Sequence, residues 1–331
     1  MRSRPELDFV RLASALAIVN YHTAKLAVPV LGSFARLGFV FNTLFMLLSG
    51  FLLALAPTEG RTPSPGAFFA RRLVRIFPPY HVALVAIAAL HLLAGRSVDP
   101  ASFARSLTGL QVFLGDTRLG PHLWFVGVIL VCYAAFLPTL WLVRRLGWAV
   151  PTALAAAFVT LYALREGTLA DVYARISADL VYRTAYHYLA FVTGLTLGAR
   201  RGSLALAGGW TALGALVGLF GAYQLVYARP QLGLVTTLVA FGLALALVPV
   251  LSAAHAGLFA RRRGVATLSG LAYEIYLVHY AVIDALDTVL HGRLWAWPLV
   301  FAGTLAVAWL VSRASRGYAR LLERLASGGR P

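Results

Sequence analysis

The stretch RLASALAIVNYH, residues 11–22, decides how the whole chain is to be interpreted. It begins with an arginine and ends with a histidine, and most of the residues between them are apolar. An ionisable side chain inside a lipid bilayer is costly, and such residues usually serve a function. What Arg11 and His22 can do therefore depends on whether this stretch crosses a membrane.

The composition of the 331 residues is that of an integral membrane protein. Hydrophobic residues make up 60% of the chain and charged residues 12%, whereas soluble domains carry about 25% charged residues. The net charge of +17 would suggest nucleic acid as the partner of a soluble protein. Because the arginines here lie between apolar runs, we expect membrane lipid and no nucleic acid around this chain.

Ten apolar runs approach the roughly 20 residues that a membrane-spanning helix needs. The runs are continuous and do not alternate with polar residues, which favours helices over the strands of a barrel. We therefore predict an all-α, polytopic membrane protein with one membrane-embedded domain over residues 1–331. The predicted spans lie near residues 8–28, 38–56, 78–94, 122–142, 147–164, 184–199, 203–222, 232–251, 266–289 and 295–312.

The distribution of basic residues tests this number of spans. With the N-terminus in the cytoplasm, ten spans place about two thirds of the 29 Lys and Arg residues on the cytoplasmic side, as the positive-inside rule requires. A missed or additional span would move later basic segments to the wrong side of the membrane. We therefore expect ten spans with both termini in the cytoplasm. Residues 57–77 are then a basic cytoplasmic segment that Pro78 and Pro79 separate from the next span. Residues 95–121 lie outside, with a short helix expected around 101–113.

Small residues in two of the runs are interpreted as sites of close helix packing. Ser49 precedes Gly50 in the second run, and packing is a better explanation for this pair than a nucleophilic serine. The seventh run is rich in glycine, which also predicts close helix contacts there. Its glycines are Gly208, Gly209, Gly214, Gly218 and Gly221.

Arg11 and His22 are eleven residues apart, which places them on one helix face. At 100° and 1.5 Å per residue they differ by about 20° in direction and about 16 Å in depth. With the N-terminus inside, Arg11 lies near the cytoplasmic mouth and His22 lies deeper. An imidazole accepts a proton from a hydroxyl near neutral pH. The alternative is a histidine that only joins two helices and an arginine that only follows the positive-inside rule.

The ninth run, LAYEIYLVHYAVIDAL over residues 271–286, carries a second membrane histidine. His279 should lie at a depth comparable with that of His22, and Tyr276 precedes it by one turn on the same side. Glu274 and Asp284 are each five residues from His279, so they point well away from its face. Any partner of His279 should therefore come from another helix. Ordinary interhelical packing is the alternative for the tyrosines.

The segment FFARRLVRIFPPY, residues 68–80, gathers arginines at one membrane surface. Clustered guanidinium groups suit phosphate, either of a ligand or of anionic lipid headgroups. The sequence contains no Walker-type loop, no paired-cysteine metal spacing and no nucleophile elbow. It therefore gives no support to a nucleotide-driven pump or a zinc enzyme, and we expect no metal site.

Several blocks in order resemble the acyltransferase 3 family of bacterial integral membrane O-acyltransferases. They are ELDFVRLASALAIVNYH, LFMLLSGFLL, RRLVRIFPPY, HLWFVGVILVCY and AYEIYLVHY. The family's Arg, ten residues and His fall on Arg11 and His22, and its cytoplasmic Arg-x-x-Arg falls on Arg72 and Arg75. Its Tyr-Leu-x-His falls on Tyr276, Leu277 and His279. In two places the chain departs from the family pattern: Trp124 is not followed by the frequent glutamate, and Glu274 stands where a small or polar residue is common.

The resemblance implies an acyltransferase in the bacterial cytoplasmic (inner) membrane. Its co-substrate would be an acyl-CoA, most simply acetyl-CoA, with no permanently bound cofactor, and its acceptor a hydroxyl of a carbohydrate or glycosylated small molecule. We hypothesise that Arg72 and Arg75, together with Arg11, bind the donor and that His22 is the general base or an acylated relay. Trp124, Tyr276 and His279 would shape the acceptor pocket.

Two other functions remain open at this stage. A transporter or exporter of a polysaccharide or lipid-linked sugar would also place polar groups near the midplane, although the sequence shows no inverted repeat. A scaffold without catalysis would leave the membrane histidines unexplained. Binding of cytoplasmic acetyl-CoA distinguishes the enzyme from the transporter.

Overall fold

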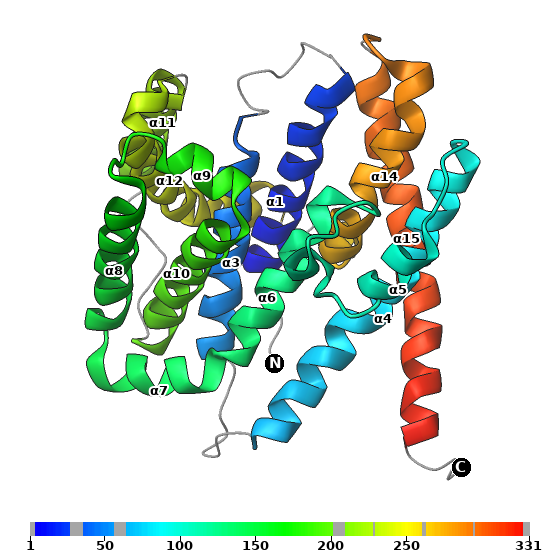
Figure 1. Ribbon diagram of the computed structural model, residues 1–331, viewed down its shortest axis with the longest axis horizontal. Helices are drawn as coiled ribbons and strands as arrows, with labels where there is room; N and C mark the ends of the chain where they lie inside the picture. Colours follow the sequence, from blue (N-terminus) through cyan, green and yellow to red (C-terminus); the bar gives the residue numbers. More distant parts are fainter. Residues whose placement is uncertain are drawn as a thin grey trace. The chain divides into compact units, whose positions relative to one another are not determined.

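The computed structural model shows an all-helical chain (Figure 1). The part of the chain that the structure describes contains helices, turns and connecting segments, and no strand. The described residues are 4–26, 36–55, 64–200, 209–227, 229–259, 263–293 and 295–326.

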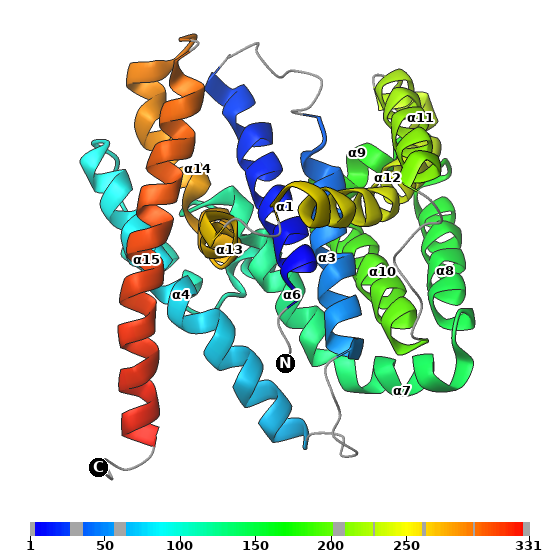
Figure 2. The same ribbon diagram turned by 180° about the vertical axis from the view of Figure 1, so that it is seen from behind.

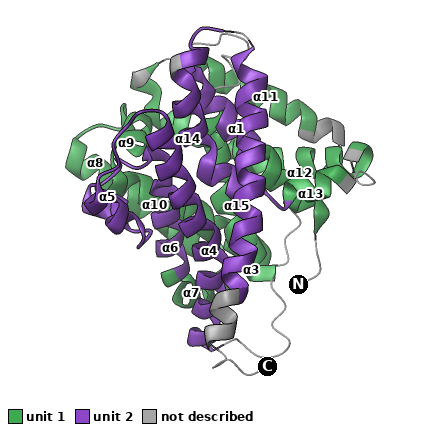
Figure 3. Ribbon diagram, turned by 90° about the vertical axis from the view of Figure 1, so that its right-hand side faces the viewer, with its two compact units in different colours: residues 1–14, 36–59, 134–269 green, residues 15–35, 60–133, 270–331 purple. Residues whose placement is uncertain are grey.

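The chain divides into two compact units, drawn in green and purple in Figure 3. Unit 1 comprises residues 1–14, 36–59 and 134–269, and unit 2 comprises residues 15–35, 60–133 and 270–331. Helix α1, Pro5–Thr23, contributes residues to both units and runs without a break. Pro5 stands in its first turn together with Glu6 and Asp8, which suits the positive end of a helix dipole.

Unit 1 is built around the parallel neighbours α3 and α10, which pack closely against each other (Figure 1). Gly50 of α3 and Gly194 of α10 make this approach possible, because a Cβ on either would overlap a backbone carbonyl of the other helix. Ser49 donates its hydroxyl to Phe45 O at 2.8 Å within α3, so the packing interpretation of this pair is confirmed. The helices of unit 1 are α3 Gly38–Leu55, α7 Phe136–Leu146, α8 Ala149–Glu166, α9 Val172–Ala178, α10 Leu180–Ala199, α11 Gly209–Tyr227, α12 Gly233–Ala254 and α13 Arg263–Ser269, with the short η5 Pro230–Leu232 and the π-helical η6 His255–Phe259.

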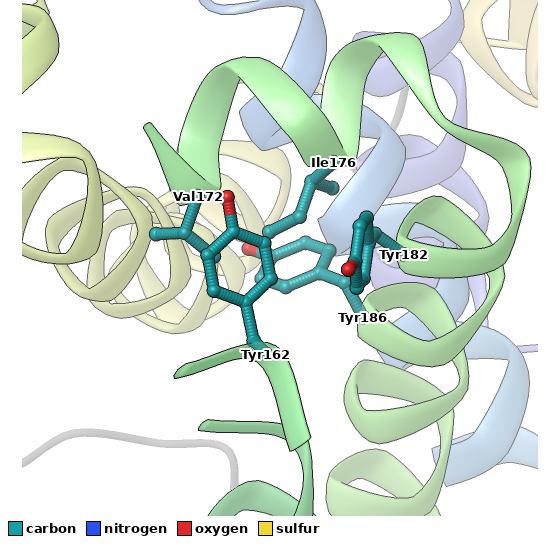
Figure 4. Packing of buried hydrophobic residues seen from close by; sticks show 5 residues of the cluster. All are labelled: Tyr162, Val172, Ile176, Tyr182 and Tyr186. Carbon is teal, nitrogen blue, oxygen red and sulfur yellow. The ribbon is translucent and has the colours of Figure 1, made fainter. Parts of the chain in front are cut away.

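A cluster of buried tyrosines and aliphatic side chains joins α8, α9 and α10 (Figure 4). The phenol of Tyr162 donates to Asp171 at 2.8 Å, and that of Tyr182 donates to Glu166 at 2.7 Å. Each ring is therefore packed among apolar neighbours while its hydroxyl donates a hydrogen bond to a carboxylate, as buried tyrosines require. This cluster fixes α8, α9 and α10 to one another.

In unit 2, helix α14 packs against α4 and α15, and α15 also packs against α4 (Figures 1 and 2). The second half of α1 is tied to this group, because Trp297 Nε1 of α15 donates to Asn20 Oδ1 at 2.9 Å. Asn20 is buried, so this bond satisfies a polar group inside the helix assembly. The helices of unit 2 are α4 Pro65–Leu93, α5 Pro100–Ser106, α6 Trp124–Ala134, α14 Ala272–Leu290 and α15 Ala296–Ala326, with the short η1 Ala24–Leu26, η3 Gln111–Leu114 and η4 Pro121–Leu123.

Helix α4 corrects one prediction. Pro78 and Pro79 do not end a preceding helix, because α4 is continuous from Pro65 to Leu93. It begins where Ser64 accepts a hydrogen bond from Ala67 N and Pro65 occupies the first turn. The two prolines remove only two hydrogen bonds from a long helix, and membrane helices tolerate this loss where neighbouring helices surround them. The short helix expected around 101–113 is present as α5.

Each of the ten predicted spans contains a helix, but length and composition qualify fewer of them as membrane-crossing. Four helices in the described ranges are long and apolar enough, or five if α6 and α7, which are separated at Ala135, form one broken span. The four are Gly38–Leu55, Pro65–Leu93, Gly233–Leu258 and Ala296–Arg320. These findings support a multi-pass membrane protein, while the ten spans and the cytoplasmic termini stay predictions.

Helix α11 contradicts the packing interpretation of its glycines. A Cβ on Gly214, Gly218 or Gly221 would meet no atom within 4 Å among the described residues. In the described part of the chain no helix contacts these three positions, so glycine spacing alone does not predict helix packing here. Gly208 lies outside the described residues.

Candidate functional site

Two imidazoles from different helices of unit 2 are in direct contact. His22 of α1 and His279 of α14 lie with Nδ1 of His22 3.1 Å from Nε2 of His279. Their ring centroids are 4.9 Å apart, and His279 is fully buried whereas His22 is partly accessible. The partner of His279 thus comes from another helix, as the positions of Glu274 and Asp284 on α14 predicted.

Backbone carbonyls determine which nitrogen of each imidazole carries the proton. Nδ1 of His22 lies 3.0 Å from Ile18 O, and Nδ1 of His279 lies 2.6 Å from Tyr276 O. Because a carbonyl oxygen only accepts, each Nδ1 donates. Nε2 of His279 then accepts from His22, whose Nδ1–H is shared between His279 and Ile18 O. The neutral His22 therefore keeps its lone pair on Nε2, which receives no hydrogen bond from the described residues.

A third imidazole, His122, completes this group and was assigned no role from the sequence. Its Nε2–H donates to Leu277 O of α14 at 2.8 Å, and its own backbone carbonyl accepts from the phenol of Tyr276. Its ring lies 4.9 Å from that of His279 and stacks on Tyr280 at 5.4 Å. Residues 121–123 and α14 thus hold each other through two reciprocal bonds. Only the tertiary structure shows this, because His122 is more than 150 residues away from its partners.

Three imidazoles so close together raise the question of a metal ion. In the ranges that the structure describes, no group of three or more His, Cys, Asp or Glu side chains is placed to hold one. Hydrogen bonds to carbonyls occupy one nitrogen of each ring. The group is therefore a hydrogen-bonded imidazole cluster, which we call the imidazole cluster of His22, His279 and His122.

Arg72 and Arg75 lie one turn apart in the first part of α4. Arg75 is exposed, whereas Arg72 is partly buried, with its guanidinium 5.7 Å from the ring of Phe68 and 5.9 Å from that of Tyr133. Aromatic faces of this kind orient a guanidinium while leaving its edge available. The buried Nε of Arg72 has no hydrogen-bond partner in the described part of the chain, while the Arg72 side chain also hydrogen-bonds to Tyr133. The pair therefore presents directed donors that are suited to phosphate.

A buried carboxylate lies near these arginines. Glu274 of α14 is 9% exposed and is hydrogen-bonded to the hydroxyl of Ser312 on α15. Arg316 donates to the same hydroxyl at 2.8 Å, and both Arg316 and Arg75 act electrostatically on Glu274. This departure from the family pattern is thus accommodated by a polar network at the contacts of α4, α14 and α15.

The remaining predicted site residues lie as follows. Arg11, on the part of α1 in unit 1, pairs with Asp8 at 3.5 Å. Trp124 opens α6 and is partly buried, with its ring 5.8 Å from that of Phe125. Phe125 in turn lies 5.0 Å from Tyr276, so Trp124 is connected to the imidazole cluster through one aromatic neighbour.

Asp284, the other carboxylate within the ninth run, belongs to a separate contact. Its Oδ2 accepts from Arg96 Nη1 at 2.7 Å. Asp284 lies five residues beyond His279 on α14, and the pair holds the segment after α4 against that helix. Asp284 is therefore occupied by an arginine and does not hydrogen-bond to His279.

Comparison with known proteins identifies the chain on grounds independent of this geometry. The acyltransferase 3 family, described as an acyltransferase domain, matches residues 4–313, which is nearly the whole chain. No curated protein and no solved structure gave a match. The matched range contains Arg11, His22, both arginines of α4 and the imidazole cluster. The chain therefore belongs to the acyltransferase 3 family, and it is a membrane acyltransferase.

Proposed function

We propose that the protein transfers an acyl group, most simply acetyl, from acyl-CoA to a hydroxyl of a carbohydrate or glycosylated acceptor, with His22 as the general base. The observation that carries this proposal is the hydrogen-bonding of His22. Its Nδ1–H is held by Ile18 O and His279 Nε2, so its Nε2 is a basic atom of fixed orientation. A base held in this way contributes roughly 10²–10⁴-fold to a proton-transfer step.

The reaction balances with the groups of the substrates and His22 alone. Nε2 of His22 removes the proton of the acceptor hydroxyl while the hydroxyl oxygen attacks the thioester carbonyl. The carbon–sulfur bond breaks, the acceptor becomes an ester, and the CoA thiolate takes the proton from the His22 imidazolium. His279 stabilises that imidazolium by accepting its Nδ1–H, and His122 and Tyr276 hold His279 in place.

Donor binding is assigned to Arg72 and Arg75, whereas the part played by Arg11, which belongs to the other unit, stays a prediction. The support is the exposed Arg75 and the aromatic-flanked Arg72 one turn before it, which present several N–H groups for phosphate. In the proposed topology these residues lie at the cytoplasmic surface of a bacterial inner membrane, crossed ten times with both termini in the cytoplasm. Trp124, Tyr276 and His279 form the wall against which the acceptor is placed.

The direct test uses purified full-length protein in detergent, [1-¹⁴C]acetyl-CoA and an extracted envelope acceptor fraction. His22→Asn keeps a donor at the position of Nδ1 and removes the base, whereas His22→Ala removes both. We expect both variants to lose 10²–10⁴-fold in acetyl transfer while they remain folded. The control is His81→Gln, because His81 makes a similar Nε2 bond to Leu107 O at 3.0 Å and its ring contacts Phe77, Tyr80 and Tyr318 instead of the imidazole cluster.

Near-normal turnover by His22→Asn would remove His22 from the mechanism. Absence of charge-dependent acetyl-CoA binding in the wild-type protein would overturn the assignment of the donor. A loss in His81→Gln equal to that in His22→Asn would show that the assay reports folding and not chemistry.

A further inference from the structure

The hydroxyl of Tyr273 is a buried polar group that nothing described above employs. Among the residues that the structure describes, it has no hydrogen-bond partner, although other phenols of unit 2 are bonded. Tyr80 donates to Ser106 O at 2.7 Å, and Tyr276 donates to His122 O. A buried unpaired hydroxyl is unfavourable for folding, so its presence in a native structure needs an explanation.

Tyr273 belongs to a row of phenols that leads to His22. Tyr273, Tyr276 and Tyr280 are three and four residues apart on α14, and this spacing places them on one face of the helix. The ring of Tyr280 lies 5.3 Å from that of His22, and Tyr276 contacts His279 with centroids 5.6 Å apart. Tyr273 precedes His279 by six residues, or about 9 Å along the helix axis.

The other end of this row reaches the arginines of α4. The electrostatic neighbours of the Tyr273 hydroxyl are Tyr80, Tyr133, Glu274 and Tyr276. Tyr133 is the ring beneath the guanidinium of Arg72, and Glu274 is acted on by Arg75. Tyr133 thus neighbours both the Tyr273 hydroxyl and the Arg72 guanidinium, and Tyr273 precedes Tyr276 and His279 along α14. Nε of Arg72 is also buried without a hydrogen-bond partner in the ranges that the structure describes.

We infer that the hydroxyl of Tyr273 is a binding site for an amide of the pantetheine arm of the donor thioester. This inference rests on the proposed function, because it assumes that a CoA thioester reaches from the arginines to His22. The arm between the phosphates and the sulfur is uncharged and carries two amides. A buried amide needs hydrogen-bond partners, and a phenol both donates to a carbonyl and accepts from an N–H. The hydroxyl that no described residue bonds is thus satisfied when the donor binds.

The test uses Tyr273→Phe, which deletes only this oxygen, with Tyr80→Phe as the matched control. Acetyl transfer by the full-length protein is measured with acetyl-CoA and with S-acetyl-pantetheine, which lacks the nucleotide phosphates. We expect Tyr273→Phe to raise the KM for both donors about 3- to 10-fold, the effect of one neutral hydrogen bond. Arg72→Gln should raise the KM for acetyl-CoA only. Tyr80→Phe should change neither KM.

Thermal unfolding separates a ligand-binding role from a structural one. Tyr273→Phe should leave the Tm unchanged or raise it, because it removes an unsatisfied group, whereas Tyr80→Phe should lower the Tm. A lower Tm for Tyr273→Phe, or unchanged KM values for both donors, would overturn the inference and indicate a structural bond or a buried water only.

A binding experiment distinguishes this inference from the proposed function. Pantetheine binding is measured by calorimetry in the His22→Gln background, where no transfer is expected. Weaker binding on addition of Tyr273→Phe supports the subsite even if His22 proves dispensable for turnover. Equal binding in the two proteins overturns the subsite and leaves the role of His22 intact.

Discussion

The α3–α10 pair of unit 1 and the α14 group of unit 2 show two different ways of holding apolar helices together. Between α3 and α10 the backbones meet directly at Gly50, Gly194 and Gly198. Around α14 the contacts include imidazoles, phenols and carbonyls, among them the pair His22 and His279. Since glycine contacts suffice for close packing in unit 1, packing alone does not require the imidazole cluster. The difference therefore favours a chemical role for the cluster.

The contrast also separates two kinds of variant. Changes at the α3–α10 contact should affect folding without a specific effect on donor or acceptor, whereas changes in the imidazole cluster should affect turnover in a folded protein. The His22 and Tyr273 experiments examine the second kind, and Gly194→Ala examines the first.

The largest effect on stability is expected for Gly194→Ala. A Cβ on Gly194 would overlap the carbonyl oxygen of Leu47, and backbone cannot rotate away as a flexible side chain could. The two helices must separate, so we expect the free energy of unfolding to fall by about 3 kcal/mol, the upper part of the range for overpacked sites. Chemical unfolding in detergent, followed by tryptophan fluorescence, measures this change. Stability equal to wild type would show that α3 and α10 are not in close contact.

The positions of most helices could be predicted from the sequence, because long continuous apolar runs have few alternatives in a bilayer. The helical start of α4 before Pro78 was missed, since its arginines resembled a loop and the prolines a stop. The break at Ala135 was also missed, because the run over 122–142 is apolar on both sides of it. Apolar residues in the sequence predict where the helices lie, whereas their exact ends are known only from the backbone of the folded chain.

The sequence could predict only those residues of the candidate site that stand out within a single helix, and not the contacts between helices. His22 and His279 stand out because ionisable residues are rare in such runs, and their roles stay predictions. His122 and Tyr273 could not be found in this way, since a histidine beside a tryptophan and one tyrosine among 14 are ordinary in sequence. Their importance depends on which carbonyl each side chain meets, or fails to meet, in the folded chain.

A smaller effect, dependent on pH, is expected at Asp116 in the segment after α5. The side chain is 4% exposed and accepts from Arg118 at 2.9 Å, from Arg105 at 2.7 Å and from Ser102 at 2.8 Å. Hydrogen bonding to Arg118, with those to Ser102 and Arg105, holds the pKa of this carboxyl well below its usual range. Asp116→Asn should lower the free energy of unfolding at pH 7 by about 2 kcal/mol, as for a hydrogen bond to a charged group.

The sign of the pH dependence follows from the lowered pKa. An unfolded aspartate titrates near pH 3.9, so the stabilisation by Asp116 is complete well above about pH 4 and is lost as the pH falls towards the lower folded pKa. The difference in Tm between wild type and Asp116→Asn should therefore be constant from pH 7 to about 5 and shrink below about pH 4. A difference that grew on acidification would contradict the arginine contacts of Asp116.

The smallest effect is expected for Gly214→Ala, and it has the opposite sign to that of Gly194→Ala. Gly214 lies within α11, and a Cβ there would meet no described atom within 4 Å. Alanine is favoured over glycine inside a helix by about 0.5–1 kcal/mol, so the free energy of unfolding should rise by about that amount. The same unfolding experiment measures it. A loss of stability instead would mean that another surface packs on this face of α11, and glycine spacing would then have the same meaning in α11 as in the α3–α10 pair.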